Sequence, residues 1–162
     1  MPFLFLMAKN TEIERKFLVQ SEAFKAQAVT SYQIVQGYLC KDPEKTIRVR
    51  IRDARAFLTI KSSVLREGIA KFEYEREIDP ADAKELLRLC LPGVITKTRY
   101  IIPAPPYKDQ ERKWEVDVFQ TGKMAGTALA EIELGDEHEP ISCPEWLGEE
   151  VTDQPQYYNA NM

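Results

Sequence analysis

The stretch Thr46-Ile47-Arg48-Val49-Arg50-Ile51-Arg52 alternates without a break between polar and aliphatic side chains. Because successive side chains of a β-strand point to opposite faces, its arginines share one face and its aliphatic residues share the other. The stretch Glu12-Ile13-Glu14-Arg15-Lys16 has the same period, and carboxylates recur with it in residues 71–77 and 130–134. Several such strands in one small chain predict a sheet that curls around a charged cavity, with its apolar face turned outward beneath helices.

The length and composition of the chain limit its organisation and its partners. Its 162 residues predict an N-terminal tail at 1–10 and a single domain at 11–162. The net charge of −4 argues against a protein that binds nucleic acid through bulk positive potential. No apolar run approaches the ~20 residues that a helix needs to span a bilayer, so we expect no membrane association.

The cysteines and the histidine narrow the kinds of site further. Cys40, Cys90 and Cys143 lie far apart without a C-x-x-C pair, which is typical of reduced thiols in a cytoplasmic protein. The single histidine, His138, nearly excludes histidine-based metal centres and Ser-His triads. No Gly-rich Walker loop is present, which excludes phosphate binding of the P-loop type.

The hydrophobic pattern predicts an α+β domain built on an eight-stranded antiparallel β-barrel, a tunnel with a charged interior and helices packed outside. One helix is expected to begin at the cap Ser21 and run through Ala28. A second is expected to begin at Asp79-Pro80, with an apolar side formed by Leu86, Leu87, Leu89 and Leu91. The expected strands are 11–19, 31–40, 45–53, 55–62, 69–78, 94–103, 111–120 and 127–135.

The period of two places nearly all of the strand charges on one face. The simplest alternative is that this face is the solvent side of a plain antiparallel sheet. Two observations favour a cavity instead, since nearly every strand is affected and Arg48, Arg50 and Arg52 follow one another on the same face. Like charges at this spacing repel one another unless an opposite charge lies over them.

A polyanion together with divalent cations would satisfy both signs of charge on this face. Arginine pairs bidentately with phosphate oxygens, and lysine adds a point charge. Mg²⁺ and Mn²⁺ bind carboxylate oxygens, water and substrate phosphate without requiring His or Cys. The pattern therefore predicts metal-assisted phosphoryl transfer.

The order of the motifs resembles that of the CYTH superfamily, also called triphosphate tunnel metalloenzymes, and in particular its small bacterial inorganic triphosphatases. The opening Glu12-x-Glu14-x-Lys16 is similar to the signature of that family. The motifs that follow it in order are Gln36-Gly37-Tyr38-Leu39, Arg48-x-Arg50, Phe57-Leu58-Thr59-Ile60-Lys61, Glu73-x-Glu75, Lys97-Thr98-Arg99-Tyr100, Trp114-Glu115-Val116-Asp117 and Ala130-Glu131-Ile132-Glu133-Leu134.

The resemblance implies a tunnel of eight strands that binds a triphosphate and a divalent metal, Mg²⁺ or Mn²⁺, at its centre. It implies a catalytic set of Glu12, Glu14, Lys16, Glu73, Glu75 and Asp117. It implies that the metal is held by Glu12, Glu14, Glu131 and Glu133. The implied substrate-binding residues are Lys16, Arg48, Arg50, Lys61, Lys71, Lys97, Arg99 and Tyr38, for which a packing role is the alternative.

We expect metal-dependent hydrolysis of a small polyanionic substrate, with inorganic tripolyphosphate cleaved to pyrophosphate and phosphate, because no base- or sugar-recognition motif is evident. The enzymatic alternatives that share the tunnel are a class IV-type adenylate cyclase, which acts on a nucleoside triphosphate, and a thiamine triphosphatase. An alternative of another class is a non-catalytic module that binds polyphosphate or nucleotide. A homodimer is left open.

Overall fold

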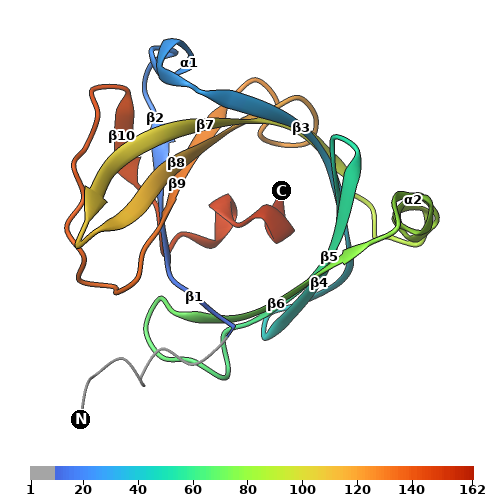
Figure 1. Ribbon diagram of the computed structural model, residues 1–162. Coiled ribbons are helices and arrows are strands. Elements are labelled where there is room, and N and C mark those ends of the chain that lie inside the picture. Colours follow the sequence, from blue (N-terminus) through green and yellow to red (C-terminus); the bar gives the residue numbers. More distant parts are fainter. Residues whose placement is uncertain (1–9) are drawn as a thin grey trace.

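The computed structural model describes residues 10–162, so the predicted tail at 1–10 lies outside the described part except for Asn10. A single antiparallel sheet of ten strands dominates the fold. Its strands form a ring in Figure 1, with the C-terminal segment inside the ring and α1 and α2 outside it. The elements are β1 (Thr11–Glu12), β2 (Glu14–Val19), α1 (Phe24–Gln27), β3 (Thr30–Asp42), β4 (Lys45–Arg52), β5 (Arg55–Ser62), β6 (Lys71–Ile78), α2 (Pro80–Arg88), β7 (Ile95–Tyr107), β8 (Gln110–Phe119), β9 (Ala128–Glu133), β10 (Leu147–Glu150), and the 3-10 helices η2 (Pro155–Tyr157) and η3 (Asn159–Asn161).

The prediction of a closed barrel of eight strands is corrected in two respects. The sheet has ten strands, in the order β1-β6-β5-β4-β3-β7-β8-β9-β2-β10, and this ladder of hydrogen bonds is open. The expected strand 11–19 divides at Ile13, so that Glu12 pairs with Lys71 of β6 whereas Glu14 pairs with Glu133 of β9. β1 at one end of the sheet is therefore joined to β2, next to the other end, by the covalent chain at Ile13 rather than by a strand pair. β10 is the additional strand, and it pairs with β2.

The outward face of the sheet is apolar, as the alternation predicts. Trp114 of β8 packs edge-to-face against Phe17 of β2 and against Trp146, with ring centroids 5.6 and 5.7 Å apart. Phe24 of α1 completes this cluster against Trp146. On the other side of the ring, Val49 and Ala56 pack beneath Ala83 of α2. These contacts turn the charged side chains of the same strands inward.

The second helix is shorter than the leucine pattern predicts. It is capped by Asp79, whose side chain accepts a hydrogen bond from the Ala81 amide, and it ends at Arg88. Leu89 and Leu91 lie beyond its end with 72% and 41% of their surface exposed, so placing them on the buried side of the helix is wrong. The chain leaves the helix because the Leu91 amide donates to the Tyr38 carbonyl of β3.

The inner face changes from charged to apolar towards one end. The inward residues there pack against the C-terminal segment, in a cluster of Ile95, Phe119, Leu129, Val151 and Met162. Each of the three strand residues lies two positions from a charged inward residue, and so it points the same way. The charged layer is thus bounded on one side by apolar packing. None of the helices in residues 10–162 is long and apolar enough to cross a membrane.

Candidate active site

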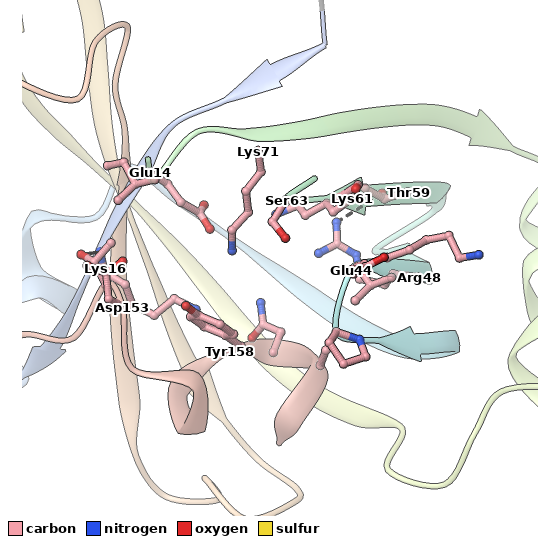
Figure 2. Close-up of a pocket in the computed structure, with 18 of the residues that line it drawn as sticks. Glu14, Lys16, Glu44, Arg48, Thr59, Lys61, Ser63, Lys71, Asp153 and Tyr158 are labelled. Carbon is pink, nitrogen blue, oxygen red and sulfur yellow. Dashed lines mark hydrogen bonds between the residues drawn. The ribbon is translucent and has the colours of Figure 1, made fainter. Parts of the chain in front are cut away.

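Two adjoining cavities, of about 280 and 200 Å³, lie within the ring of strands. Both are lined by Glu14, Arg48, Lys61 and Asn159. Figure 2 shows the larger cavity, where Lys16 and Lys71 lie beside Tyr158 of the C-terminal segment. The inner charges thus surround an enclosed space and do not form the solvent side of a flat sheet.

The cavities bring together most of the predicted site residues. The larger one is lined by Glu14, Lys16, Tyr38, Arg48, Lys61 and Lys71. The smaller one is lined by Glu12, Glu14, Arg48, Arg50, Lys61, Glu73, Glu75, Arg99, Glu131 and Glu133. Two predicted residues, Lys97 and Asp117, line neither cavity because they are buried in the wall, with 0% and 3% of their surface exposed.

The arginines of β4 are held by uncharged inner-face residues. The Nε of Arg50 donates to Oε1 of Gln36 at 2.9 Å, across the β3–β4 pair. Nη2 of Arg48 donates to the Thr59 hydroxyl at 3.3 Å, and that hydroxyl donates to Glu75 at 2.8 Å. Burial lowers the pKa of the Arg50 guanidinium to about 9, with Arg48 and Arg99 adding to the effect, so this arginine remains charged at neutral pH.

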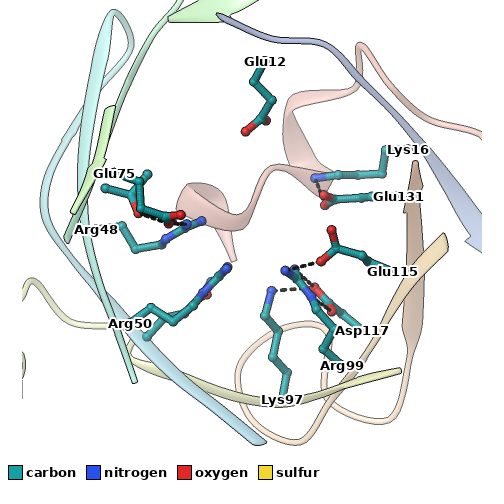
Figure 3. Close-up of polar contacts among 12 residues, drawn as sticks. Glu12, Lys16, Arg48, Arg50, Glu75, Lys97, Arg99, Glu115, Asp117 and Glu131 are labelled. Carbon is teal, nitrogen blue, oxygen red and sulfur yellow. Dashed lines mark hydrogen bonds and ion pairs between the residues drawn. The ribbon is translucent and has the colours of Figure 1, made fainter. Parts of the chain in front are cut away.

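The basic residues of β7 are instead neutralised by carboxylates (Figure 3). Lys97 donates to Asp117 at 2.5 Å, and Arg99 donates to both oxygens of Asp117 and contacts Glu115 at 2.6 Å. Burial opposes the ionisation of Asp117, but the charges of Arg99 and Lys97 outweigh it and hold its pKa well below the usual range. Burial lowers the pKa of Lys97 to about 7, an effect that Asp117 only partly offsets.

The carboxylates of β1, β2 and β9 form an acidic side opposite these cations. Burial raises the pKa of Glu14 to about 8, with the charge of Glu131 adding to it, and the protonated Glu14 shares a hydrogen bond with Glu131. Glu12 accepts from Lys61 at 2.8 Å. Burial also raises the pKa of Glu12, although Lys61 partly opposes this. The two neighbouring carboxylates of β2 and β9 thus share one proton rather than carrying two charges.

The C-terminal segment contacts two of the predicted phosphate-binding lysines. Nζ of Lys16 donates to the Tyr157 carbonyl at 2.8 Å and lies 3.3 Å from Glu131, its cross-strand neighbour. The Tyr158 ring lies over Nζ of Lys71, 4.6 Å from the ring centroid. The sequence alone leaves open whether Tyr157 and Tyr158 belong to a tail that closes one end of the tunnel or to a packed terminus, and it predicts neither of these contacts. Gln36 is also missed because it carries no charge, although it shares the inward parity of Tyr38.

The carboxylates of the smaller cavity are the candidate ligands for a divalent metal. Within residues 10–162, no three acidic, cysteine or histidine side chains converge as a preformed metal cluster. Glu12 is bound to Lys61, and Glu14 is protonated against Glu131. The donor chemistry fits a hard cation, since Glu12, Glu14, Glu131 and Glu133 all line the smaller cavity. To bind a metal, they would exchange the contacts with Lys61 and Lys16 and the proton of Glu14 for it.

Comparison with known proteins identifies the family. The CYTH domain family matches residues 10–161. The chain belongs to the CYTH family. A CYTH relative from Acetivibrio thermocellus, an inorganic triphosphatase, is 40% identical over 152 residues, which cover 93% of this chain and 92% of the relative.

Two further CYTH comparisons extend over nearly the whole chain. An inorganic triphosphatase of Nitrosomonas europaea is 34% identical over 156 residues, which cover 94% of this chain and 96% of that protein. The crystal structure of the inorganic triphosphatase NE1496 superposes with a TM-score of 0.62 at 32% identity, covering 93% of this chain and 95% of that one. The family membership that the ordered motifs predict is confirmed, and it implies dependence on a divalent metal.

Proposed function

We propose that this protein is a metal-dependent inorganic triphosphatase, which hydrolyses tripolyphosphate to pyrophosphate and phosphate. The observation that carries the proposal is the pair Arg48 and Arg50, which are buried in the cavity wall without a full counter-charge. Buried cations of this kind favour a bound anion, and arginine forks match phosphate oxygens. The names of the two curated relatives support the same activity.

The basic side chains in our proposal bind the phosphates and stabilise charge in the transition state. Arg48 and Arg50 bind from β4, Lys61 from β5, and Lys16 and Lys71 from the side of the C-terminal segment. Arg99 also reaches the smaller cavity. Tyr38 lines the larger cavity, where its hydroxyl is available to a phosphate oxygen. Preorganised donors of this kind supply most of the rate in phosphoryl transfer.

Two predicted residues have different roles in our proposal from those that the family resemblance implies. Asp117 is fully engaged by Lys97 and Arg99 and lies outside both cavities, so it positions Arg99 and does not orient water. Lys97 likewise acts through Asp117 and not through the substrate. Glu73 and Glu75 do line the smaller cavity, where they are placed to orient the attacking water.

The metal, Mg²⁺ or Mn²⁺, would be held by Glu12, Glu14, Glu131 and Glu133. When bound, it supplies Lewis-acid neutralisation of phosphate charge and makes a coordinated water more acidic. The carboxyl of Glu14 would have to give up its proton to hold the metal, because only the carboxylate form ligates. Lys61, which Glu12 holds in the structure, would then be available to the phosphates.

The test is the release of phosphate from tripolyphosphate, ATP and thiamine triphosphate, with Mg²⁺, with Mn²⁺ and with EDTA. We expect turnover of tripolyphosphate in the presence of either metal and its loss in EDTA. Absence of metal-dependent turnover with all three substrates would contradict the proposal. Formation of cyclic AMP from ATP would identify a cyclase instead, and tight binding of tripolyphosphate without hydrolysis would identify a binding module.

A further inference from the structure

Gln36 is an uncharged residue at the centre of a strongly cationic wall. It lies on β3, directly across from Arg50, and none of its surface is exposed. Its inward neighbours two residues away are Ile34, which pairs with Lys97, and Tyr38, which lines the larger cavity. Its two cross-strand partners are Arg50, whose side chain carries only donors, and the apolar Ile95.

The orientation of the Gln36 amide follows from the chemistry of its partner. Arginine carries only donors, so Oε1 of Gln36 is the atom that accepts from Nε of Arg50 at 2.9 Å. The amide nitrogen Nε2 then has no acceptor among residues 10–162. A buried donor without a partner destabilises the fold relative to an apolar side chain of similar shape. Local packing therefore does not account for a glutamine at this position.

The contact determines which donors of Arg50 remain available. With Nε bound to Gln36, the Nη1 and Nη2 groups at the end of the guanidinium are left for the cavity, and Figure 3 shows this end pointing to the centre of the ring. A carboxylate at position 36 would hold Nε equally well but would also neutralise the charge, as Asp117 does for Arg99. An amide fixes the geometry and leaves the positive charge for a ligand.

We propose that Gln36 is a positioning residue that holds Arg50 for bidentate phosphate contact without neutralising its charge. The inference rests on the proposed function, because it takes the chain of phosphates as the ligand of Arg50. Position 36 then requires an uncharged hydrogen-bond acceptor of the size of glutamine. A residue with a purely structural role would carry no such requirement, since an Arg–Glu pair is geometrically at least as good as an Arg–Gln pair.

The test compares Gln36→Glu and Gln36→Leu with the wild type. The dissociation constant of tripolyphosphate is measured by calorimetry in EDTA, and kcat and KM are measured with Mg²⁺ or Mn²⁺. We expect Gln36→Glu to weaken binding about tenfold or more and Gln36→Leu to weaken it about three- to tenfold, with the larger change in KM. Gln36→Glu should unfold at the same temperature as the wild type or higher. Gln33→Glu is the matched control, because Gln33 lies on the outer face of the same strand, and binding should not change.

The Arg50→Ala background separates action through Arg50 from a general effect on the fold. There, adding Gln36→Leu should change the dissociation constant less than twofold, because a positioning residue has nothing left to position. An additive effect of Gln36→Leu, or wild-type binding by Gln36→Glu, would overturn the inference and leave the proposed function intact. Binding without hydrolysis by the wild type would overturn the proposed function alone, and absence of binding would overturn both.

Discussion

The basic pair on β4 and the basic pair on β7 have the same spacing in the sequence but opposite electrostatic environments. Arg48 and Arg50 are held by a hydroxyl and an amide, and among residues 10–162 the pair forms one ion pair, the 3.8 Å contact between Arg48 and Glu75. Lys97 and Arg99 converge on Asp117. The β4 pair therefore keeps its charge for a ligand, whereas the β7 pair uses most of its charge to stabilise the wall.

This difference indicates that a period-two basic motif does not by itself identify phosphate ligands. A cation buried in the wall is either paired with a carboxylate of the protein or available to bind an anion from outside. The partner across the strand decides between the two, because Arg50 faces Gln36 whereas Arg99 faces Asp117. The predictions below test this contrast, beginning with the largest expected effect.

Asp117→Asn should destabilise the folded protein at the β7 pair. It leaves Lys97 and Arg99 buried without their shared carboxylate, and removing one partner of a buried ion pair costs about 3–5 kcal/mol of folding free energy. Urea unfolding monitored by tryptophan fluorescence measures this loss. Glu77→Gln, which removes an exposed partner of Arg55, is the control and should leave stability nearly unchanged, because exposed ion pairs contribute little. A stable Asp117→Asn variant would contradict the structural role of this pair.

Arg50→Ala, at the β4 pair, should have the opposite effect. Activity should be lost with little loss of stability. We expect kcat/KM for tripolyphosphate to fall about 100-fold or more, because a preorganised transition-state donor is removed. Stability should stay near that of the wild type, since Arg50 is hydrogen-bonded to the Gln36 amide and forms no ion pair among residues 10–162. Arg55→Ala, on an exposed site, is the matched control for the assay. Equal stability losses in Arg50→Ala and Asp117→Asn would remove the contrast.

The dependence of stability on pH should report the burial of Lys97 in the β7 pair. The pKa of Lys97 is lowered to about 7 by burial, so between about pH 7 and its ordinary value of 10.5 the unfolded chain binds more protons at this position than the folded chain. Stability should therefore rise with pH in that window, by at most about 1.4 kcal/mol per pH unit. Unfolding of the wild type and of Lys97→Met at several pH values measures this slope. The slope should be smaller in Lys97→Met, and an unchanged slope would assign it to another group.

Thr59→Val should produce the smallest change. It removes the hydroxyl that links Arg48 to Glu75 and keeps the shape of the side chain. We expect kcat/KM to fall about three- to tenfold, the effect of losing one hydrogen bond of ordinary strength. Steady-state kinetics with tripolyphosphate checks this, and Thr59→Ser, which keeps the hydroxyl, should restore most of the rate. A Thr59→Val variant with wild-type kinetics would show that Arg48 needs no such support.

The sequence predicts well which strand side chains point into the ring, because the period of a strand is a local property. Arg48, Lys61, Glu73 and Glu131 reach the cavities as their parity indicates. The same rule cannot place Asp117, which has the correct parity but lies beneath Lys97 and Arg99 in the wall. Parity reports the face of a side chain but not its depth, which depends on the length and charge of the side chains across the strand.

A local pattern also cannot predict the division of the first strand at Ile13. Residues 11–19 alternate as one strand, yet they pair with β6 on one side of Ile13 and with β9 on the other. Their hydrogen-bond partners are separated from them by dozens of residues in the sequence. The C-terminal contacts of Lys16 and Lys71 are likewise long-range, and no alternation predicts them.

Side-chain period and motif order are enough to predict the face on which each charge lies, the apolar outer side of the sheet and the membership of the family. The tertiary structure is needed to see which cations are neutralised, which carboxylates share a proton and where the sheet remains open. The physical reason is that charge balance in a buried site is a property of neighbours in space. Arg50 and Arg99 differ in their partners and not in their own sequence pattern.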